Sequence, residues 1–138
     1  MTDDLASLEK LRRIPVFAEL DDPALELVAR LFSEVEAPAG QVLVEHGHVG
    51  SGMFLLEEGT VSVELPGHPV ELGPGEFFGE LSILADDVPR TARVRSATPI
   101  RALVIGRPDF RRLLEEQPRI AVSMLPVLAH RLAEVLEG

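Results

Sequence analysis

The sequence predicts a mainly β fold, an antiparallel β-roll or jelly-roll-like barrel with helices at both ends. Between residues 34 and 106 the apolar runs are short and are separated by Gly and Pro, which is typical of antiparallel strands joined by turns. On both sides of this region apolar residues recur at three- and four-residue spacing, as on one face of a helix. We therefore expect one domain, with N-terminal helices over 1–33, the β-roll over 34–106 and C-terminal helices over 107–138.

The N-terminal region predicts two helices joined by a turn. Leucines at three-residue spacing predict a short amphipathic helix over residues 2–12. Residues 14–20 contain a proline and predict the turn. Asp22 followed by Pro23 predicts the N-cap and the first position of the second helix. That helix should end before Pro38.

Six short runs predict the strands of the β-roll. Val61–Leu65 shows the clearest signal, because apolar and polar residues alternate there as on a half-buried strand. Glu58–Gly59 predicts a tight hairpin turn between two strands, and Pro66–Gly67 predicts another turn. The six predicted strands are Gln41–Glu45, Met53–Glu57, Thr60–Leu65, Pro69–Leu72, Arg93–Ala97 and Arg101–Ile105.

The C-terminal region predicts two further helices. The first opens at Arg107 and reaches about Gln117, and Pro118 takes the first position of a final helix that ends near Leu136. Pro126 lies inside the final helix, removes one backbone hydrogen bond and is expected to kink it.

The final helix carries two apolar stripes. One stripe comprises Ala121, Leu125, Leu128, Leu132 and Val135, and the other comprises Ile120, Met124 and Val127. Two stripes require two surfaces that bury them. The candidates are the β-roll, the same helix of a second copy, a lid position over a ligand, or simply the protein's own core.

The composition restricts the function. A net charge of −10 and a pI near 4.8 argue against non-specific nucleic-acid binding. The chain has no cysteine, which excludes disulfides and Cys-based zinc sites. An acidic N-terminus without an apolar run and the lack of a membrane-length segment lead us to expect a cytoplasmic protein without a membrane partner.

Residues 73–95, GPGEFFGELSILADDVPRTARVR, combine three features that suit a phosphate ligand. The glycines let the backbone approach a ligand closely. The short apolar segment after Gly79 can form a helical turn whose free N–H groups point at an anion. Arg90 offers a planar fork of donors that stays charged. We therefore expect an anion site in this stretch.

The motif FGELSIL, followed by a loop and PRTARV, resembles the phosphate-binding cassette of cyclic nucleotide-binding domains, the family of the catabolite activator protein and of kinase regulatory subunits. A looser resemblance extends from about Ile14 to the C-terminus. It implies a β-roll that encloses the cassette helix. It also implies a regulatory module that binds a 3′,5′-cyclic nucleotide, with cyclic AMP favoured over cyclic GMP, and moves its C-terminal helix in response.

The resemblance also implies roles for single residues. Phosphate contacts would come from Arg90, Thr91, Leu81 and Ser82, and ribose contacts from Glu80 and Gly79. The base pocket and its lid would comprise Val70, Leu72, Arg131, Val135 and Leu136. The last two are apolar where the catabolite activator protein has polar side chains that read adenine. An apolar lid can cover a purine without reading its edge.

Plainer roles exist for the two charged residues at the centre of the motif. Arg90 can pair with Asp86 or Asp87 at the surface. Glu80 can favour the helix dipole, or pair with Arg90 in an empty site.

We expect no enzyme activity, no metal and no cofactor besides the nucleotide. A homodimer through the C-terminal helix and a downstream protein partner are expected. Direct DNA binding is not expected, because the transcription-factor relatives carry a helix-turn-helix after the long helix and this chain ends at Gly138. Whether the chain is a fragment stays open.

Two other classes of protein remain as alternatives. The first is a structural module of the same fold that binds no nucleotide. The second is a cupin-like metal protein, since His46 and His48 have the spacing of a metal motif. That motif needs a glutamate where Gly52 and Met53 stand, which makes a metal site improbable.

Overall fold

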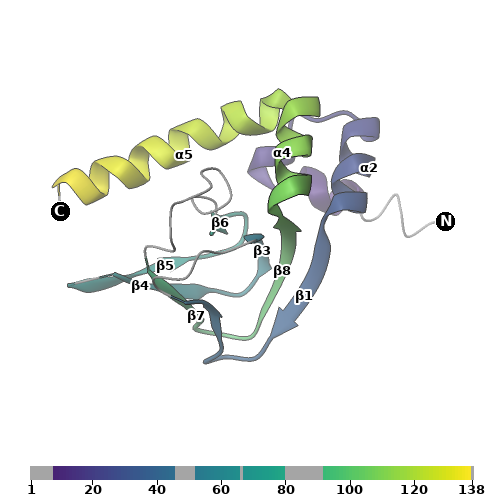
Figure 1. The fold of residues 1–138 in the computed structure, drawn as a ribbon. Coiled ribbons are helices and arrows are strands. Elements are labelled where there is room, and N and C mark those ends of the chain that lie inside the picture. The colour runs from purple at the N-terminus through teal and green to yellow at the C-terminus, as the bar shows by residue number, and fades with distance from the viewer. Residues whose placement is uncertain (1–7, 46–51, 66, 80–91, 138) are drawn as a thin grey trace. The chain divides into compact units, whose positions relative to one another are not determined.

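The computed structural model describes residues 8–45, 52–65, 67–79 and 92–137. Residues 135–137 are described as backbone alone. The chain forms two compact units (Figure 1). A helical unit comprises Met1–Arg30 with Arg112–Gly138, and a β unit comprises Leu31–Arg111.

The helical unit contains helices at the positions where the sequence predicts them, although residues 2–7 of the first predicted helix lie outside the described residues. Residues 8–12 are helical, and the expected turn contains a short 3₁₀ helix, η1 (Pro15–Phe17). The other helices are α2 (Asp22–Leu31), α4 (Arg107–Glu116), which runs from the β unit into the helical unit, and α5 (Pro118–Glu137). Asp21 rather than Asp22 caps α2, because its carboxylate accepts a hydrogen bond from the Ala24 N–H at 3.0 Å.

Each helix carries buried apolar side chains. Helix α5 packs against η1, and among the described side chains of α5 those of Ile120 and Met124 are buried. An ion pair between Arg119 and Glu19, 3.4 Å apart, joins the start of α5 to the residues just after η1. Both partners are exposed, so this pair contributes little stability by itself.

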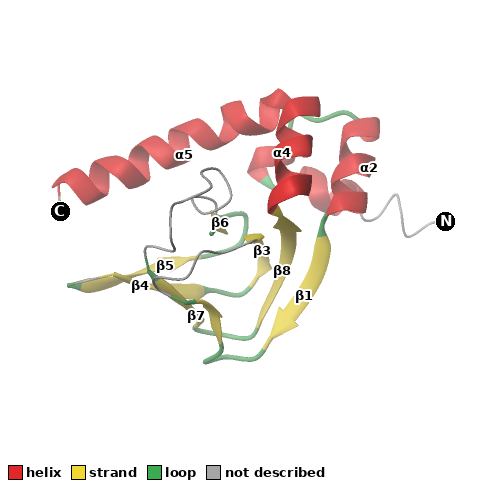
Figure 2. Ribbon diagram, viewed as in Figure 1, coloured by secondary structure: helices red, strands yellow, loops and turns green. Residues whose placement is uncertain are grey.

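Two four-stranded sheets form the β unit (Figure 2). The first has the order β1-β8-β3-β6 and the second the order β2-β7-β4-β5, with every pair antiparallel. The strands are β1 (Ser33–Ala37), β2 (Val42–Val44), β3 (Gly52–Glu58), β4 (Val61–Leu65), β5 (His68–Leu72), β6 (Phe77–Phe78), β7 (Arg93–Ser96) and β8 (Ile100–Gly106). The predicted antiparallel β fold and all six predicted strands are confirmed.

Two strands were not predicted from the sequence. The helix that should end before Pro38 ends at Leu31, and β1 follows it at once. Only Ala37 of β1 is buried, so the strand shows no clear alternation of buried and exposed residues. The two glutamates of β1 are good helix formers, and the sequence of this segment therefore resembles a continuation of α2. Strand β6 has two residues, too few for any periodicity.

The predicted hairpin at Glu58–Gly59 is wrong. Strands β3 and β4 belong to different sheets and do not pair, so the chain crosses between the sheets there. Gly59 has φ +84°, and a Cβ at this position would lie 2.2 Å from the Pro99 carbonyl oxygen. The crossing therefore requires glycine. At the other predicted turn, Pro66 lies outside the described residues, but β4 and β5 on either side of it pair as a hairpin with Leu65 opposite His68.

All eight strands contribute to one apolar cluster of the β unit. A side chain from each of the first seven strands and two from β8 form it: Ala37, Val44, Leu56, Val61, Leu72, Phe78, Val94, Ile100 and Ala102. Five less buried residues pack against it: Val35, Leu43, Phe54, Val63 and Val70. The two sheets are thus joined by burial of apolar side chains, which is the main stabilising contribution in such a fold.

Candidate functional site

The segment that carries the FGELSIL and PRTARV motifs connects one sheet to the other. It leaves the first sheet after β6 and enters the second sheet at β7. Residues 80–91 lie outside the described residues. The predicted contacts of Glu80, Leu81, Ser82, Arg90 and Thr91 therefore stay predictions. The described structure instead shows how the two ends of the segment are held.

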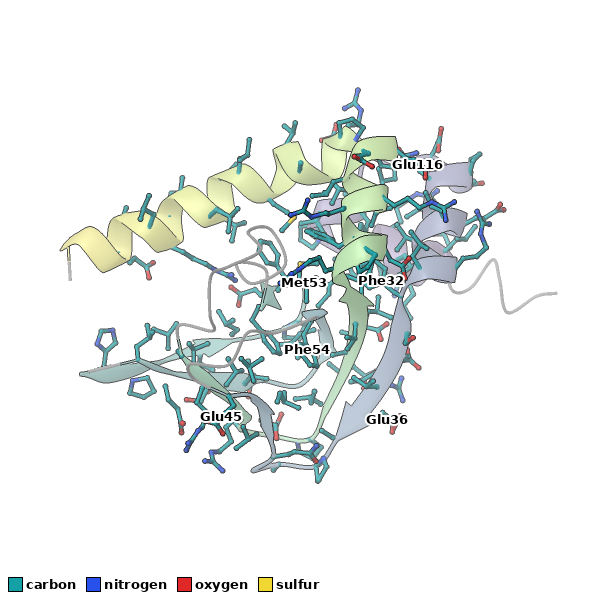
Figure 3. All side chains as sticks on the ribbon, in the orientation of Figure 1. Phe32, Glu36, Glu45, Met53, Phe54 and Glu116 are labelled. Carbon is teal, nitrogen blue, oxygen red and sulfur yellow. The ribbon has the colours of Figure 1, made fainter. Side chains whose placement is uncertain are left out.

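At the first end, β6 is fixed to β3 through backbone and rings. Phe77 and Phe78 pair with Leu55 and Phe54. The rings of Phe54 and Phe78 stack with centroids 4.9 Å apart and planes 4° from parallel (Figure 3 labels Phe54). Gly79 follows directly with φ +87°, a conformation that L side chains rarely adopt. The chain direction at the start of the cassette thus depends on this glycine.

The glycine-rich segment 73–76, just before β6, forms a turn that is held by hydrogen bonds. The Gly73 N–H donates to a carboxylate oxygen of Glu76 at 2.9 Å. The Gly75 N–H donates to the Leu56 carbonyl at 2.8 Å, and the Leu56 N–H donates to the Glu76 carbonyl at 2.9 Å. The N–H groups of Gly73 and Gly75 thus already donate hydrogen bonds within the protein. The role of these two glycines is therefore to shape the turn. The sequence analysis did not single out Glu76, and no motif marks its role.

At the second end, β7 pairs with β2 on one side and β4 on the other. Ala92 and Val94 are 5% and 4% exposed, whereas Arg93 and Arg95 are half-buried. The two small side chains therefore point inward, and the two arginines point outward. Because β7 is a central strand, its hydrogen bonds on both edges fix the chain immediately after Arg90 and Thr91.

The two outward arginines are neutralised by carboxylates. The Arg93 Nε lies 2.8 Å from Glu45 and 3.8 Å from Glu64, and the Arg95 Nε lies 3.5 Å from Glu64 (Figure 3 labels Glu45). The hydrogen bond to Glu45 and the charge of Glu45 raise the pKa of Arg93 above its ordinary value. Arg93 and Arg95 thus form a paired surface network rather than a second anion site.

The two predicted base-pocket residues on β5 lie on one face of the strand. Val70 and Leu72 are two residues apart, opposite Val63 and Val61 of β4. Leu72 is 7% exposed and belongs to the apolar cluster, whereas Val70 is only partly buried at its margin. Val70 is therefore the one of the two with apolar surface left for a ligand.

The remaining predicted residues belong to α5 of the helical unit. Arg131 is half-buried, and 135 and 136 are described only as helical backbone. Of the first predicted stripe, Leu125 and Leu132 are each 59% exposed. Val122, which the sequence analysis left out of both stripes, is 63% exposed.

No metal site is visible among the described residues. They contain no group of three or more His, Asp or Glu side chains that could hold an ion. His46 and His48 lie outside the described residues. Within the described part of the chain, no helix is both apolar enough and long enough to cross a membrane.

Comparisons with known proteins agree with this framework. Residues 34–117, more than half of the chain, match the family described as "Cyclic nucleotide-binding domain". A cyclic nucleotide-gated potassium channel of Rhizobium etli is 39% identical over 88% of this chain and 34% of its own length. A CRP-like cAMP-activated global transcriptional regulator of Mycobacterium tuberculosis is 30% identical over 90% of this chain and 58% of its own length.

Among solved structures, the catabolite activator protein of Thermus thermophilus superposes with a TM-score of 0.75 at 30% identity. The match covers 88% of this chain and 59% of that protein. The chain thus spans about a third of the channel and under two thirds of the regulator. The matched region includes both sheets and the cassette between them. On these grounds the chain belongs to the cyclic nucleotide-binding domain family.

Proposed function

We propose that the chain is a regulatory, non-catalytic domain that binds a 3′,5′-cyclic nucleotide in the cassette between β6 and β7. The observation that supports this most strongly is that the structure fixes the chain at both ends of the cassette. Its first end follows the Phe54–Phe78 stack and Gly79, and its second end is the central strand β7. A segment fixed at both ends can present backbone donors at little entropic cost on binding.

The proposed phosphate contacts combine one charge with several dipoles. The guanidinium of Arg90 neutralises the phosphate, and the N–H groups of Leu81 and Ser82 donate to its oxygens. Thr91 adds a hydroxyl donor. These contacts give the selectivity for an anion that a chain of net charge −10 does not provide elsewhere.

The proposed ribose contact explains an acidic residue beside an anion. Glu80 accepts a hydrogen bond from the 2′-hydroxyl, and Gly79 lets the backbone approach the sugar. Without such a partner, the carboxylate of Glu80 would repel the phosphate.

The proposed base site is apolar. Val70 lies beside Leu72 at the margin of the core, and its partly exposed side chain offers a surface for a purine face. Val135, Leu136 and Arg131 of α5 form the proposed lid. Cyclic AMP is favoured over cyclic GMP, with support from the name of the cAMP-activated mycobacterial relative.

The proposed response involves α5, which moves when the nucleotide binds and pairs with α5 of a second copy. Val122, Leu125, Ala129 and Leu132 are exposed and follow a 3-4-3 spacing, as in the seam of two paired helices. This exposed row supports a homodimer, and the signal would then pass to a downstream protein partner.

Isothermal titration calorimetry with cyclic AMP and cyclic GMP tests the proposal, with 5′-AMP as a control that has the same base and an open phosphate. We expect saturable binding of both cyclic nucleotides, tighter for cyclic AMP, and much weaker binding of 5′-AMP. Equal binding of the two cyclic nucleotides would refute the base preference alone. Absence of binding by either would refute the sensor and favour a structural module of the same fold.

A further inference from the structure

Helix α5 divides into two parts at Pro126 by how its side chains are buried. Ile120 and Met124, both before the proline, are 1% and 2% exposed. Among the described side chains after the proline, residues 127–134, none is buried. The helix nevertheless continues without a break from Pro118 to Glu137 (Figure 1).

The first part of α5 is anchored within the helical unit. It packs against η1, where Val16 and Phe17 are buried, and Arg119 lies 3.4 Å from Glu19. Removing a fully buried Ile or Met side chain from its packing is strongly unfavourable. Separating residues 118–125 from the helical unit would therefore be costly, whereas the described side chains after Pro126 are only half-buried or exposed.

Pro126 weakens the helix where these two parts meet. Proline has no N–H, so the carbonyl of Val122 has no donor four residues later, and the ring crowds that carbonyl. The side chain of Val122 is 63% exposed and Pro126 is exposed, so the side of the turn that carries these two residues faces solvent. Water can then hydrate the free carbonyl and allow the helix to bend locally.

We infer that the helix has a hinge at Pro126, about which residues 127–137 move while residues 118–125 stay fixed to the helical unit. The use of this hinge in signalling rests on the proposed function, because it gives the ligand-linked movement of α5 a pivot. The hinge itself is a property of the helical unit and needs no nucleotide for its detection.

Hydrogen exchange of the ligand-free protein, followed amide by amide, detects the hinge. We expect a step at Pro126: the amides of 127–130 exchange at nearly the same rate as those of 133–136 and much faster than those of 123–125. Simple fraying predicts instead a gradient that rises toward the C-terminus. A gradient without a step would overturn the inference.

Pro126→Ala supplies the missing donor and should slow exchange of residues 127–130 by at least about tenfold, since one restored hydrogen bond is worth roughly 1 kcal/mol and alanine favours the helix further. Val122→Ala is the matched control. It improves helix propensity in the same exposed turn and restores no hydrogen bond, so its effect should be less than about threefold. Equal effects of the two variants, or none from Pro126→Ala, would overturn the inference.

A second measurement with saturating cyclic AMP separates the hinge from the proposed function. If the nucleotide binds, we expect added protection in residues 127–137 and none in residues 118–125. Protection spread evenly along α5 would overturn the hinge while leaving nucleotide binding intact. If calorimetry shows no binding, the sensor proposal fails, and the step at Pro126 in the ligand-free protein still decides the hinge.

Discussion

The ring of Phe54 lies stacked on the ring of Phe78, with centroids 4.9 Å apart and planes 4° from parallel. Phe54 belongs to β3 and Phe78 to the two-residue strand β6. Because so short a strand has few backbone hydrogen bonds, the ring contact supplies much of what fixes its position. Gly79 and the cassette follow directly, so the start of the site depends on this contact.

Phe54→Ala should therefore destabilise the fold by about 3 kcal/mol, within the range for truncating a packed aromatic ring. Phe54→Leu is the control that keeps an apolar side chain, and it should cost about 1 kcal/mol. Since the chain has no Trp and no Tyr, urea unfolding is best followed by far-ultraviolet circular dichroism. Equal losses in the two variants would show that the stacked ring has no special role.

Gly59→Ala should destabilise the β unit by more than about 3 kcal/mol, because it adds a backbone clash to the strain of a left-handed residue. The new Cβ would lie 2.2 Å from the Pro99 carbonyl oxygen, and backbone cannot move aside cheaply. Thermal unfolding of the purified variant measures the loss.

Gly67→Ala is a matched control for this prediction. Gly67 has φ +93°, close to the +84° of Gly59, but a Cβ there meets nothing within 4 Å. This variant should lose only about 1 kcal/mol from the backbone conformation. If both variants lose the same amount, contact with Pro99 does not explain the need for glycine at the crossing.

Much of the fold can be predicted from the spacing of apolar residues and from the positions of Gly and Pro. Alternation identified Val61–Leu65, and three- and four-residue spacing identified α5. The failures have physical causes. The glutamates of β1 suit a helix as well as an exposed edge strand. At Glu58–Gly59 the sequence contains a turn signal, but whether two strands pair or separate is decided by packing on distant residues such as Pro99.

The site was predictable to a different extent. The motif located the cassette and the family, because those residue types act locally. The residues that hold its ends could not be found in this way. Glu76 binds the turn through a Gly73 N–H, and buried Ser96 donates to the Pro38 carbonyl at 2.6 Å across 58 residues of chain. Such partners are set by tertiary structure and leave no spacing signal.

Arg90→Ala should weaken cyclic AMP binding by at least about tenfold, since a charge-assisted hydrogen bond contributes roughly 1.5–3 kcal/mol. Circular dichroism should be unchanged, and calorimetry gives the affinity. Arg95→Ala is the control, because Arg95 is occupied on the outer face by Glu64 and by the Gly40 carbonyl. It should change affinity by less than about twofold. Equal affinities of the Arg90 variant and the unsubstituted protein would remove Arg90 from the phosphate site.

Leu132→Glu should shift the proposed homodimer toward monomer, because it places a charge in the exposed apolar row formed by Val122, Leu125, Ala129 and Leu132. A carboxylate buried between two helices without a partner carries a desolvation penalty of several kcal/mol. Multi-angle light scattering over a range of protein concentrations, with and without cyclic AMP, measures the mass of the particle in solution.

His130→Glu is the matched control for this experiment, since it adds the same side chain at an exposed position of α5 outside the row. The dimer should persist in that variant, because its new carboxylate stays in water. If the unsubstituted protein is a monomer under all conditions, the exposed row does not pair two copies. If both variants dissociate the dimer equally, added negative charge on α5 is responsible, and the contact lies elsewhere than along Val122 to Leu132.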